Sequence, residues 1–247
     1  MIGVFGGSGF YEFMDGGIEV PTPTPYGEPA SNPTVGQIGG VEVAFIPRHG
    51  RNHEYPPHLV PYRANAWAMH ELGVDRMVAP AAVGSLKLEM APGHFVIPDQ
   101  IVDRTWGRAG TFSDGPQVRH IEFADPYDPV ISELAATAMR NTGATVHEGA
   151  TVAVLQGPRF STRAESAHYR NAGWELLNMN QMPEAALALE LGIRYCSISV
   201  VTDYDVGLGD HEAVTQDAVL TQFAASLDTL RTGLTALMPP LAAAELG

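Results

Sequence analysis

Cysteine is almost absent from this chain: Cys196 is the only one among 247 residues. A single cysteine cannot form an internal disulfide, which is typical of a protein from a reducing cytoplasm. The sequence also lacks a positively charged leader before its first glycines, and it has no apolar run long enough to cross a bilayer. We therefore expect a cytoplasmic protein without a membrane segment.

Positive charge is scarce as well. The chain has 14 Lys and Arg against 28 Asp and Glu, which gives a formal net charge of −14. A field of this sign repels nucleic acid and anionic membranes, so neither is expected as a partner. A small anionic substrate would need a local cluster of arginine.

The composition is that of a globular protein, with 45% hydrophobic and 17% charged residues. No repeat or linker divides the chain, so we expect one domain over residues 1–247. A long amphipathic helix is predicted over Glu212–Leu237, with Pro239-Pro240 ending it. The alanine-rich tail, Leu241–Gly247, is expected to be loosely held.

Short apolar runs alternate with helical patterns along the rest of the chain. The predicted strands are Ile2–Phe5, Val35–Ile38, Val41–Ile46, Met77–Val83, Phe95–Val102, Thr151–Leu155, Leu176–Met179 and Ile198–Val201, and the predicted helices before the last are Tyr62–Leu72, Ile131–Asn141 and Ala185–Leu191. This alternation predicts an α/β fold with a mixed, mostly parallel twisted sheet flanked by helices. Polar motifs follow several strands, as in a sheet that binds a small ligand at its carboxyl edge.

Two aspartates follow the most apolar strand, in the stretch Ser197–Asp205. Residues two apart on a strand share a face, so Asp203 and Asp205 would point at one ligand if the strand continues. Two carboxylates suit the edge of a purine that carries N7 and a 6-amino group, because both accept from the amino group and a protonated one donates to N7. The alternative is a pair of solvated loop carboxylates.

The densest cationic stretch is Arg48-His49-Gly50-Arg51-Asn52-His53, which makes it the best candidate for an anion site. His49 and His53 have the spacing of a helical zinc pair, but Gly50 and nearby prolines disfavour a helix, so we expect no metal. The glycine-rich turn Gly6–Gly9 is able to bring backbone N–H groups to an oxyanion, although an ordinary tight turn is the better explanation of a single glycine cluster.

Five motifs together identify a family. They are, in order, Gly6-Gly7-Ser8-Gly9, Arg48-His49-Gly50-Arg51, the block Gly157–Ser166, Asn178-Met179…Met182-Pro183-Glu184 and Thr202-Asp203-Tyr204-Asp205. The ordered set closely resembles the methylthioadenosine phosphorylase branch of the trimeric purine nucleoside phosphorylases, over Ile2 to about Leu237.

The resemblance implies a pentosyltransferase of purine salvage that works as a homotrimer without metal or organic cofactor. Phosphate attacks C1′ of a purine ribonucleoside, most plausibly 5′-methylthioadenosine, and releases adenine and 5-methylthioribose 1-phosphate. A purine nucleoside phosphorylase for 6-oxopurines or other 5′-substituted nucleosides is the alternative. A hydrolytic nucleosidase and a catalytically silent nucleoside-binding protein are more distant ones.

The resemblance also implies roles for individual residues. Phosphate would be held by Ser8, Arg48, His49, Ala81, Ala82 and Asn180; the nucleoside would be bound by Phe160, Asn178, Met179, Asp203, Asp205, Val219 and Leu220, and by His120 reaching into a neighbouring subunit. Asp203, Asp205 and His49 would carry the catalysis, with Asp203 addressing N7 and Asp205 the 6-amino group.

Three positions depart from the pattern of the family. Threonine is common where Ala81 and Asn180 stand, so one hydroxyl facing phosphate is missing and an amide replaces the other. Gln216 stands where an apolar residue often lines the methylthio pocket, and a polar group there suits a different 5′ substituent such as a hydroxyl. This last alignment requires a one-residue gap within Gly207–Asp210.

Overall fold

The computed structural model describes residues 1–6, 14–206, 208–209 and 211–246. Its helices are α1 (Tyr62–Glu71), α2 (Pro129–Arg140), α3 (Arg163–Asn171), α4 (Gln181–Glu190) and α5 (Gln216–Ala243). Its strands are β1 (Ile2–Gly6), β2 (Asp15–Glu19), β3 (Thr34–Ile38), β4 (Val41–Pro47), β5 (Arg76–Ser85), β6 (Phe95–Ile97), β7 (Gln100–Arg104), β8 (Val146–Glu148), β9 (Thr151–Leu155), β10 (Leu176–Asn178) and β11 (Arg194–Asp203).

All of these strands belong to one 11-stranded sheet that branches at β5. Its main path runs β2-β3-β4-β1-β5-β10-β9-β7, and β11 also pairs with β5 and leads to β6 and β8. Six pairings are parallel, and four, β2–β3, β3–β4, β5–β10 and β6–β11, are antiparallel. The predicted mixed, mostly parallel sheet is confirmed.

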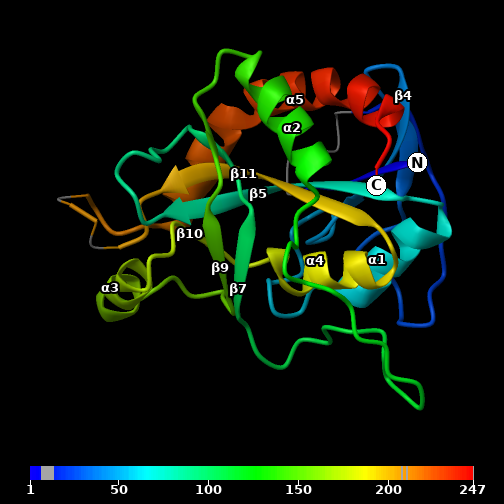
Figure 1. The fold of residues 1–247 in the computed structure, drawn as a ribbon, viewed down its shortest axis with the longest axis horizontal. Helices are drawn as coiled ribbons and strands as arrows, with labels where there is room; N and C mark the ends of the chain where they lie inside the picture. Colours follow the sequence, from blue (N-terminus) through cyan, green and yellow to red (C-terminus); the bar gives the residue numbers. More distant parts are fainter. Residues whose placement is uncertain (7–13, 207, 210, 247) are drawn as a thin grey trace.

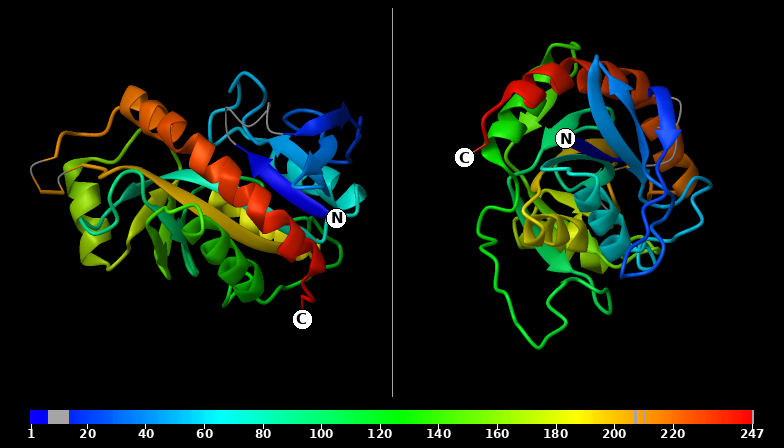
Figure 2. Two further views of the ribbon diagram at one scale, coloured as in Figure 1. Left: turned by 90° about the horizontal axis from the view of Figure 1, so that it is seen from above. Right: turned by 90° about the vertical axis from the view of Figure 1, so that its right-hand side faces the viewer.

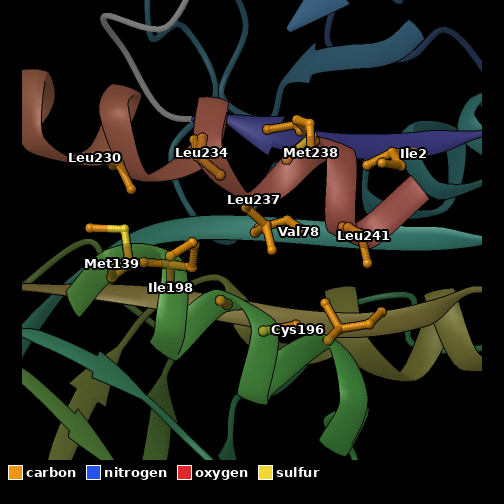
Figure 3. Close-up of a cluster of buried hydrophobic side chains, with 14 of the residues drawn as sticks. Ile2, Val78, Met139, Cys196, Ile198, Leu230, Leu234, Leu237, Met238 and Leu241 are labelled. Atoms are coloured by element: carbon orange, nitrogen blue, oxygen red, sulfur yellow. The ribbon is translucent and has the colours of Figure 1, made fainter. Parts of the chain in front are cut away.

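Helices cover both faces of this sheet: α5 and α2 lie on one side, and α1 and α4 lie on the other (Figure 1). Side chains of β5 alternate between the two cores, with Val78 in the cluster under α5 and Met77 in the cluster under α1 and α4. This is the period-two pattern of a strand buried on both faces. Figure 3 shows Leu234 and Leu237 of α5 packed toward Val78.

The C-terminal segment corrects a prediction. Helix α5 continues through Pro239 and Pro240 to Ala243, and it does not end before them. Leu241 is fully buried in the core, and the Arg76 guanidinium donates hydrogen bonds to the backbone carbonyls of Leu241 and Ala244. The expected loose tail is thus anchored through Leu241, because burial of that side chain offsets the backbone bonds that the prolines cannot make.

A second correction concerns the strand predicted over Phe95–Val102. The structure has two strands there, separated at Pro98, and β6 pairs with β11 and β8 whereas β7 pairs with β9. Proline lacks the N–H that a continuous ladder would need. The short strands β2 and β8 were not predicted. The hairpin β3–β4, with Gly39 and Gly40 in its turn, is confirmed.

No helix within the described residues has the length and apolar character that a membrane crossing requires. Figure 2 shows α5 running along the molecule and a green loop that extends away from the body between β7 and α2. This loop corresponds to the long connection predicted over Thr105–Pro126.

Candidate active site

A cavity of about 430 Å³ opens where β4, β5, β9, β10 and β11 end and α5 begins. Its volume is within the usual range for small-molecule sites. The carboxyl ends of the parallel strands β4, β5 and β11 lie at one edge of the sheet. The antiparallel pairing of β10 with β5 brings Asn178 and the loop after it alongside the same part of β5. Among the predicted site residues, those that line the cavity are Arg48, His49, Ala81, Ala82, Phe160, Asn178, Met179, Asn180, Asp203, Asp205, Val219 and Leu220.

Two predicted site residues are missing from this list for different reasons. Ser8 lies outside the described residues. His120 is exposed in the long loop and does not line the cavity of its own chain. Its expected contact with a neighbouring subunit stays a prediction.

The carboxylate pair reaches the cavity by a different geometry from the one predicted. Strand β11 ends at Asp203, and Asp205 has a φ of 50°, which turns the chain out of the strand. The Asp205 backbone N–H donates to Asp203 Oδ1 at 2.8 Å, so a local turn holds the two residues together. The aspartates therefore share the cavity because of this turn and not because a strand continues.

The two carboxyl groups have different environments. Burial raises the pKa of Asp203 above its usual value, although hydrogen bonds from the Thr202 hydroxyl and the Asp205 N–H act in the opposite direction. Asp205 is only 4% exposed, and its Oδ2 is buried with no hydrogen-bond partner among the described residues. A buried acceptor of this kind is normally satisfied, so Asp205 Oδ2 is available to a ligand donor.

Arg48 also lines the cavity and is 2% exposed. It contacts the Pro80 carbonyl of β5, whereas Asp203 is paired with Gly84, four residues further along the same strand, so the two side chains lie toward opposite ends of the cavity. Its Nε and Nη2 bind Glu184 at 2.8 and 3.1 Å, while Nη1 donates to the Pro80 carbonyl and Nη2 to the Phe5 carbonyl. Glu184 also accepts the Tyr195 hydroxyl at 2.7 Å. Arg48 is therefore a fixed, charge-compensated donor in the floor of the site.

The cationic cluster expected around Arg48 is largely neutral in the structure. Arg51 is half exposed and pairs with Glu19, and it does not line the cavity. Burial lowers the pKa of His49 to about 4, assisted by the charge of Arg48. The expectation of an arginine-rich anion site is corrected in this respect: the carboxylate of Glu184, inserted by α4, offsets the one buried guanidinium.

The zinc alternative for His49 and His53 is not supported by their geometry. The two rings stack at a centroid distance of 4.4 Å, with Gly50 in a turn between them. His49 Nδ1 faces the Tyr55 carbonyl at 2.7 Å, and its Nε2 faces the Asn180 amide nitrogen at 3.1 Å. Within the described ranges, no group of three or more His, Cys, Asp or Glu side chains is placed to hold a metal ion.

The loop after β10 supplies the side chains between the two ends. Asn178 is buried, and its amide group donates to the Ala82 carbonyl while its Oδ1 accepts the backbone N–H groups of Asn180 and Gln181. These bonds assign Asn178 a positioning role that links β5 to the loop. Met179 and Asn180 follow it on the cavity wall.

The third part of the cavity is formed by the first turns of α5. Gln216, Val219, Leu220 and Phe223 line it there. The Thr215 hydroxyl caps the helix by accepting the Ala218 N–H. Gln216 thus lies beside apolar neighbours on the same wall of the cavity. The polar residue that stands here in place of the apolar residue often found in the family therefore lines the cavity.

The model of the phosphorylase superfamily matches residues 1–236. The chain belongs to the phosphorylase superfamily.

Two curated members of the superfamily are similar to it at the level of sequence. A purine nucleoside phosphorylase from Streptomyces coelicolor is 46% identical over 93% of this chain and 85% of its own length. An S-methyl-5′-thioadenosine phosphorylase from Pyrococcus furiosus is 51% identical over 83% of this chain and 79% of its own length.

A solved structure of the superfamily is similar to the whole chain. It is methylthioadenosine phosphorylase from Schistosoma mansoni in complex with adenine, with 35% identity and a TM-score of 0.92. The match covers 99% of this chain and 92% of the other. The predicted family and fold are confirmed by these comparisons.

Three residues of this superfamily member gain significance only from the structure. Glu184 is part of one of the five sequence motifs, and the structure shows that its carboxylate pairs with Arg48, 136 positions away in the sequence. Ser161 lines the cavity with its buried Oγ unpartnered among the described residues, while the adjacent Thr162 caps α3 in a capping box with Glu165. The pairing of Thr162 with Glu165 is visible in sequence, whereas the partner of Glu184 is not.

Arg108 is the third such residue. From the long loop it donates to the backbone carbonyls of Met179, Met182, Leu155 and Gln156, and its guanidinium lies over the Tyr62 ring. It therefore ties together the loops after β9 and β10. No sequence signal marks it, because its main partners are backbone carbonyls.

Proposed function

We propose that this protein catalyses the phosphorolysis of 5′-methylthioadenosine to adenine and 5-methylthioribose 1-phosphate. The observation that carries the proposal is one cavity with a carboxylate pair, Asp203 and Asp205, at one end and the buried Arg48 at the other. The Pyrococcus relative is named for this activity, and the Schistosoma structure holds adenine. Both support the methylthioadenosine assignment over a 6-oxopurine nucleoside.

In the proposed reaction an oxygen of phosphate forms a bond to C1′ while the bond from C1′ to N9 breaks. The electron pair of that bond moves onto the purine, whose N7 takes a proton from Asp203. Asp205 Oδ2 accepts from the 6-amino group, and this contact satisfies the oxygen that is unpartnered among the described residues. Catalysis then consists of positioning and of charge stabilisation at both ends.

The raised pKa of Asp203 supports its role as the proton donor, because a buried carboxyl keeps its proton to a higher pH. The neighbouring Asp205 acts as a hydrogen-bond acceptor, which suits an amino group at C6 and disfavours a carbonyl there, because two acceptors would oppose each other. Phe160 and Met179 would pack against the purine and the ribose, and Val219 and Leu220 would enclose the 5′ group.

At the anion end, Arg48, His49, Asn180, the segment Ala81–Ala82 and Ser8 would hold phosphate beneath the sugar. Neither a metal nor an organic cofactor has a part in this mechanism. The proposed setting is purine salvage in the cytoplasm.

The proposed assembly is a homotrimer in which the long loop reaches a neighbouring subunit. The loop extends away from the body of its own chain (Figure 2), and its Trp106 and Val118 are each 68% exposed. Large apolar side chains on a projecting loop are typical of a buried subunit contact. His120 would contribute to the neighbour's site from this loop.

The proposal is tested by measuring adenine release from 5′-methylthioadenosine with and without phosphate, and by comparing adenosine and inosine as substrates. We expect cleavage to depend on phosphate and 5′-methylthioadenosine to give the highest kcat/KM. Undiminished cleavage without phosphate would identify a hydrolase. A clear preference for inosine would instead favour the 6-oxopurine alternative, and tight binding without product would indicate a silent binding protein.

A further inference from the structure

One guanidinium lies directly behind two residues of the cavity wall. Arg108 does not line the cavity, but it donates to the backbone carbonyls of Leu155 and Met179, which do. We propose that Arg108 is a positioning residue for the nucleoside: it fixes the loops after β9 and β10 relative to each other, so that Phe160 on one loop and Met179 on the other enclose the same ligand. The inference rests on the proposed function, since it concerns how the site of that reaction holds its nucleoside.

The two loops leave the sheet side by side. Strands β9 and β10 are parallel neighbours, so both chains turn away from the sheet at the same edge. The loop after β9 carries Phe160, and the loop after β10 carries Met179. They touch at Gly157, where an added Cβ would lie 2.5 Å from Met179 Sδ. A shift of one loop therefore changes the distance between the proposed purine and ribose contacts.

Arg108 reaches both loops with one rigid group. Its Nη1 donates to the carbonyls of Met179 and Met182, at 2.8 and 2.5 Å. Its Nη2 donates to the carbonyls of Leu155 and Gln156, at 3.2 and 2.8 Å. The guanidinium is planar and its donors form a fixed fork, so it sets the separation of the two pairs of carbonyls.

Three of these carbonyls lie outside the regular hydrogen-bond patterns of strand and helix. Gln156 follows the last residue of β9, and Met179 follows the last residue of β10. Met182 has φ −117° and ψ 132°, which are not helical values, although it lies within α4. Carbonyls of this kind are normally satisfied by another donor, and Arg108 is that donor. Among the described residues no carboxylate accepts from Arg108, so its hydrogen bonds go to these loops and to the Tyr62 hydroxyl.

Arg108 belongs to the long loop between β7 and α2, which has other attachments as well. Arg63 of α1 pairs with Asp114, and the Phe112 backbone N–H donates to Glu190 of α4 at 2.7 Å. Neither contact involves the loops after β9 and β10. Arg63 thus anchors the same long loop without lining the cavity, which makes it the matched control for Arg108.

The first test measures binding without turnover. Isothermal titration calorimetry with 5′-methylthioadenosine in phosphate-free buffer should give a Kd about tenfold higher for folded Arg108→Ala than for the wild type, since the two loops lose their common anchor. Arg63→Ala should stay within about threefold of the wild-type Kd, because a partly exposed ion pair contributes little. A wild-type Kd in folded Arg108→Ala would overturn the proposal. Equal losses in the two variants would overturn it as well, because they would assign the effect to attachment of the long loop.

Steady-state kinetics adds a readout that a general loss of stability would not give. In Arg108→Ala we expect kcat/KM for 5′-methylthioadenosine to fall by about a hundredfold, the effect of a misplaced substrate, whereas the KM for phosphate should change by less than about threefold. Phosphate should be affected less because the Tyr55 carbonyl holds His49 and the Asn178 side chain holds the backbone of Asn180. An equal rise in both KM values would contradict a role confined to the nucleoside.

Chemical rescue separates positioning from folding. Free guanidinium ion, well below denaturing concentrations, should restore part of the kcat/KM of Arg108→Ala, and sodium chloride at the same ionic strength should not. No response to guanidinium in the folded variant would contradict the assigned role.

Arg108→Lys covers the case in which Arg108→Ala does not fold. One ammonium nitrogen with three N–H groups cannot bridge both pairs of carbonyls, so the Kd of this variant for 5′-methylthioadenosine should rise as well. A wild-type Kd and kcat/KM in Arg108→Lys would overturn the proposal.

The two proposals can fail separately. Binding of 5′-methylthioadenosine that weakens in Arg108→Ala but not in Arg63→Ala, with no adenine release by the wild type, would refute the proposed reaction and leave the positioning role intact. Phosphate-dependent release of adenine by the wild type, together with an unchanged Kd and kcat/KM in folded Arg108→Ala, would refute the positioning role alone.

Discussion

Burial and specific partners together set the protonation states of Asp203, His49 and Arg48 in the cavity. Burial raises the pKa of Asp203. Burial, assisted by the positive charge of Arg48, lowers the pKa of His49. Arg48 keeps its charge because Glu184 accompanies it into the interior. The two ends of the cavity thus differ in chemistry: burial favours the protonated form of Asp203 at one end and the neutral form of His49 at the other.

At Asp203, the substitution Asp203→Asn removes the proton donor and retains the shape. We expect kcat on 5′-methylthioadenosine to fall by about a hundredfold, a typical effect of losing one acid–base partner. Steady-state kinetics with 5′-methylthioadenosine and inosine would measure it, and inosine should be affected less. A rate close to the wild-type value would remove Asp203 from the mechanism.

His49 predicts a pH dependence of stability. Its folded pKa of about 4 lies below the ordinary 6.5, so between these values the unfolded chain binds more protons. The free energy of unfolding should therefore fall as pH falls from about 6.5 to 4, by on the order of 3 kcal/mol from this residue. Urea unfolding across this range would measure it.

His49→Gln should flatten that part of the stability curve relative to the wild type. The exposed His120→Gln is the matched control, and its curve should follow that of the wild type. Equal slopes in all three proteins would contradict a buried neutral His49.

At the scale of elements, local signals were sufficient for some segments and not for others. The hairpin β3–β4 was predictable because Gly39 and Gly40 both have positive φ, which a two-residue turn requires. The separation of β6 from β7 was not predictable from the sequence, because the partner strands of each lie far away in the chain and Pro98 alone does not specify them. The continuation of helix α5 beyond Pro239 and Pro240 was not predictable either, because it depends on the burial of Leu241 in the core, which is a tertiary contact.

The same hairpin supplies a prediction at this scale. A Cβ at Gly39 would lie 2.6 Å from the Thr235 carbonyl oxygen of α5, whereas a Cβ at Gly40 would meet nothing within 4 Å. Gly40→Ala should cost about 1–2 kcal/mol from its positive φ alone. Gly39→Ala should cost at least about 1 kcal/mol more, because the hairpin must move away from α5.

Chemical denaturation of both variants would measure these costs. In a helix the carbonyl of Thr235 would accept the backbone N–H of residue 239, but residue 239 is a proline and has no N–H. The β3–β4 turn packs over this carbonyl at Gly39. Equal losses of stability for the two glycines would show that the turn does not contact the helix closely.

At the scale of the molecule, the site depends on contacts that no local pattern reveals. The resemblance to the family predicted most of the site residues that line the cavity, although it did not mark Ser161 or Glu54, which line it too. It also did not predict that Glu184 neutralises Arg48, nor that Arg108 binds the carbonyls of Met179 and Gln156. Such pairs require the complete tertiary arrangement.

The attachment of the C-terminus can be tested at this scale. Leu241→Ala should lower the free energy of unfolding by about 2–5 kcal/mol, the usual range for a buried leucine. Glu245→Ala, at an exposed position, should change it by less than about 0.5 kcal/mol. Thermal or urea unfolding would compare them, and a Leu241→Ala protein as stable as the wild type would restore the view of a loose tail.

Strand β5 is paired with β1, β10 and β11, and this branch fixes the geometry between the anion end and the base end of the cavity. The first turn of α5, in contrast, is not part of the sheet, and it contributes Gln216 and Val219 to the cavity wall. Laboratory evolution toward a nucleoside with a bulkier or more polar 5′ group should therefore accumulate its changes in that turn, while the phosphate and purine contacts are inherited unaltered.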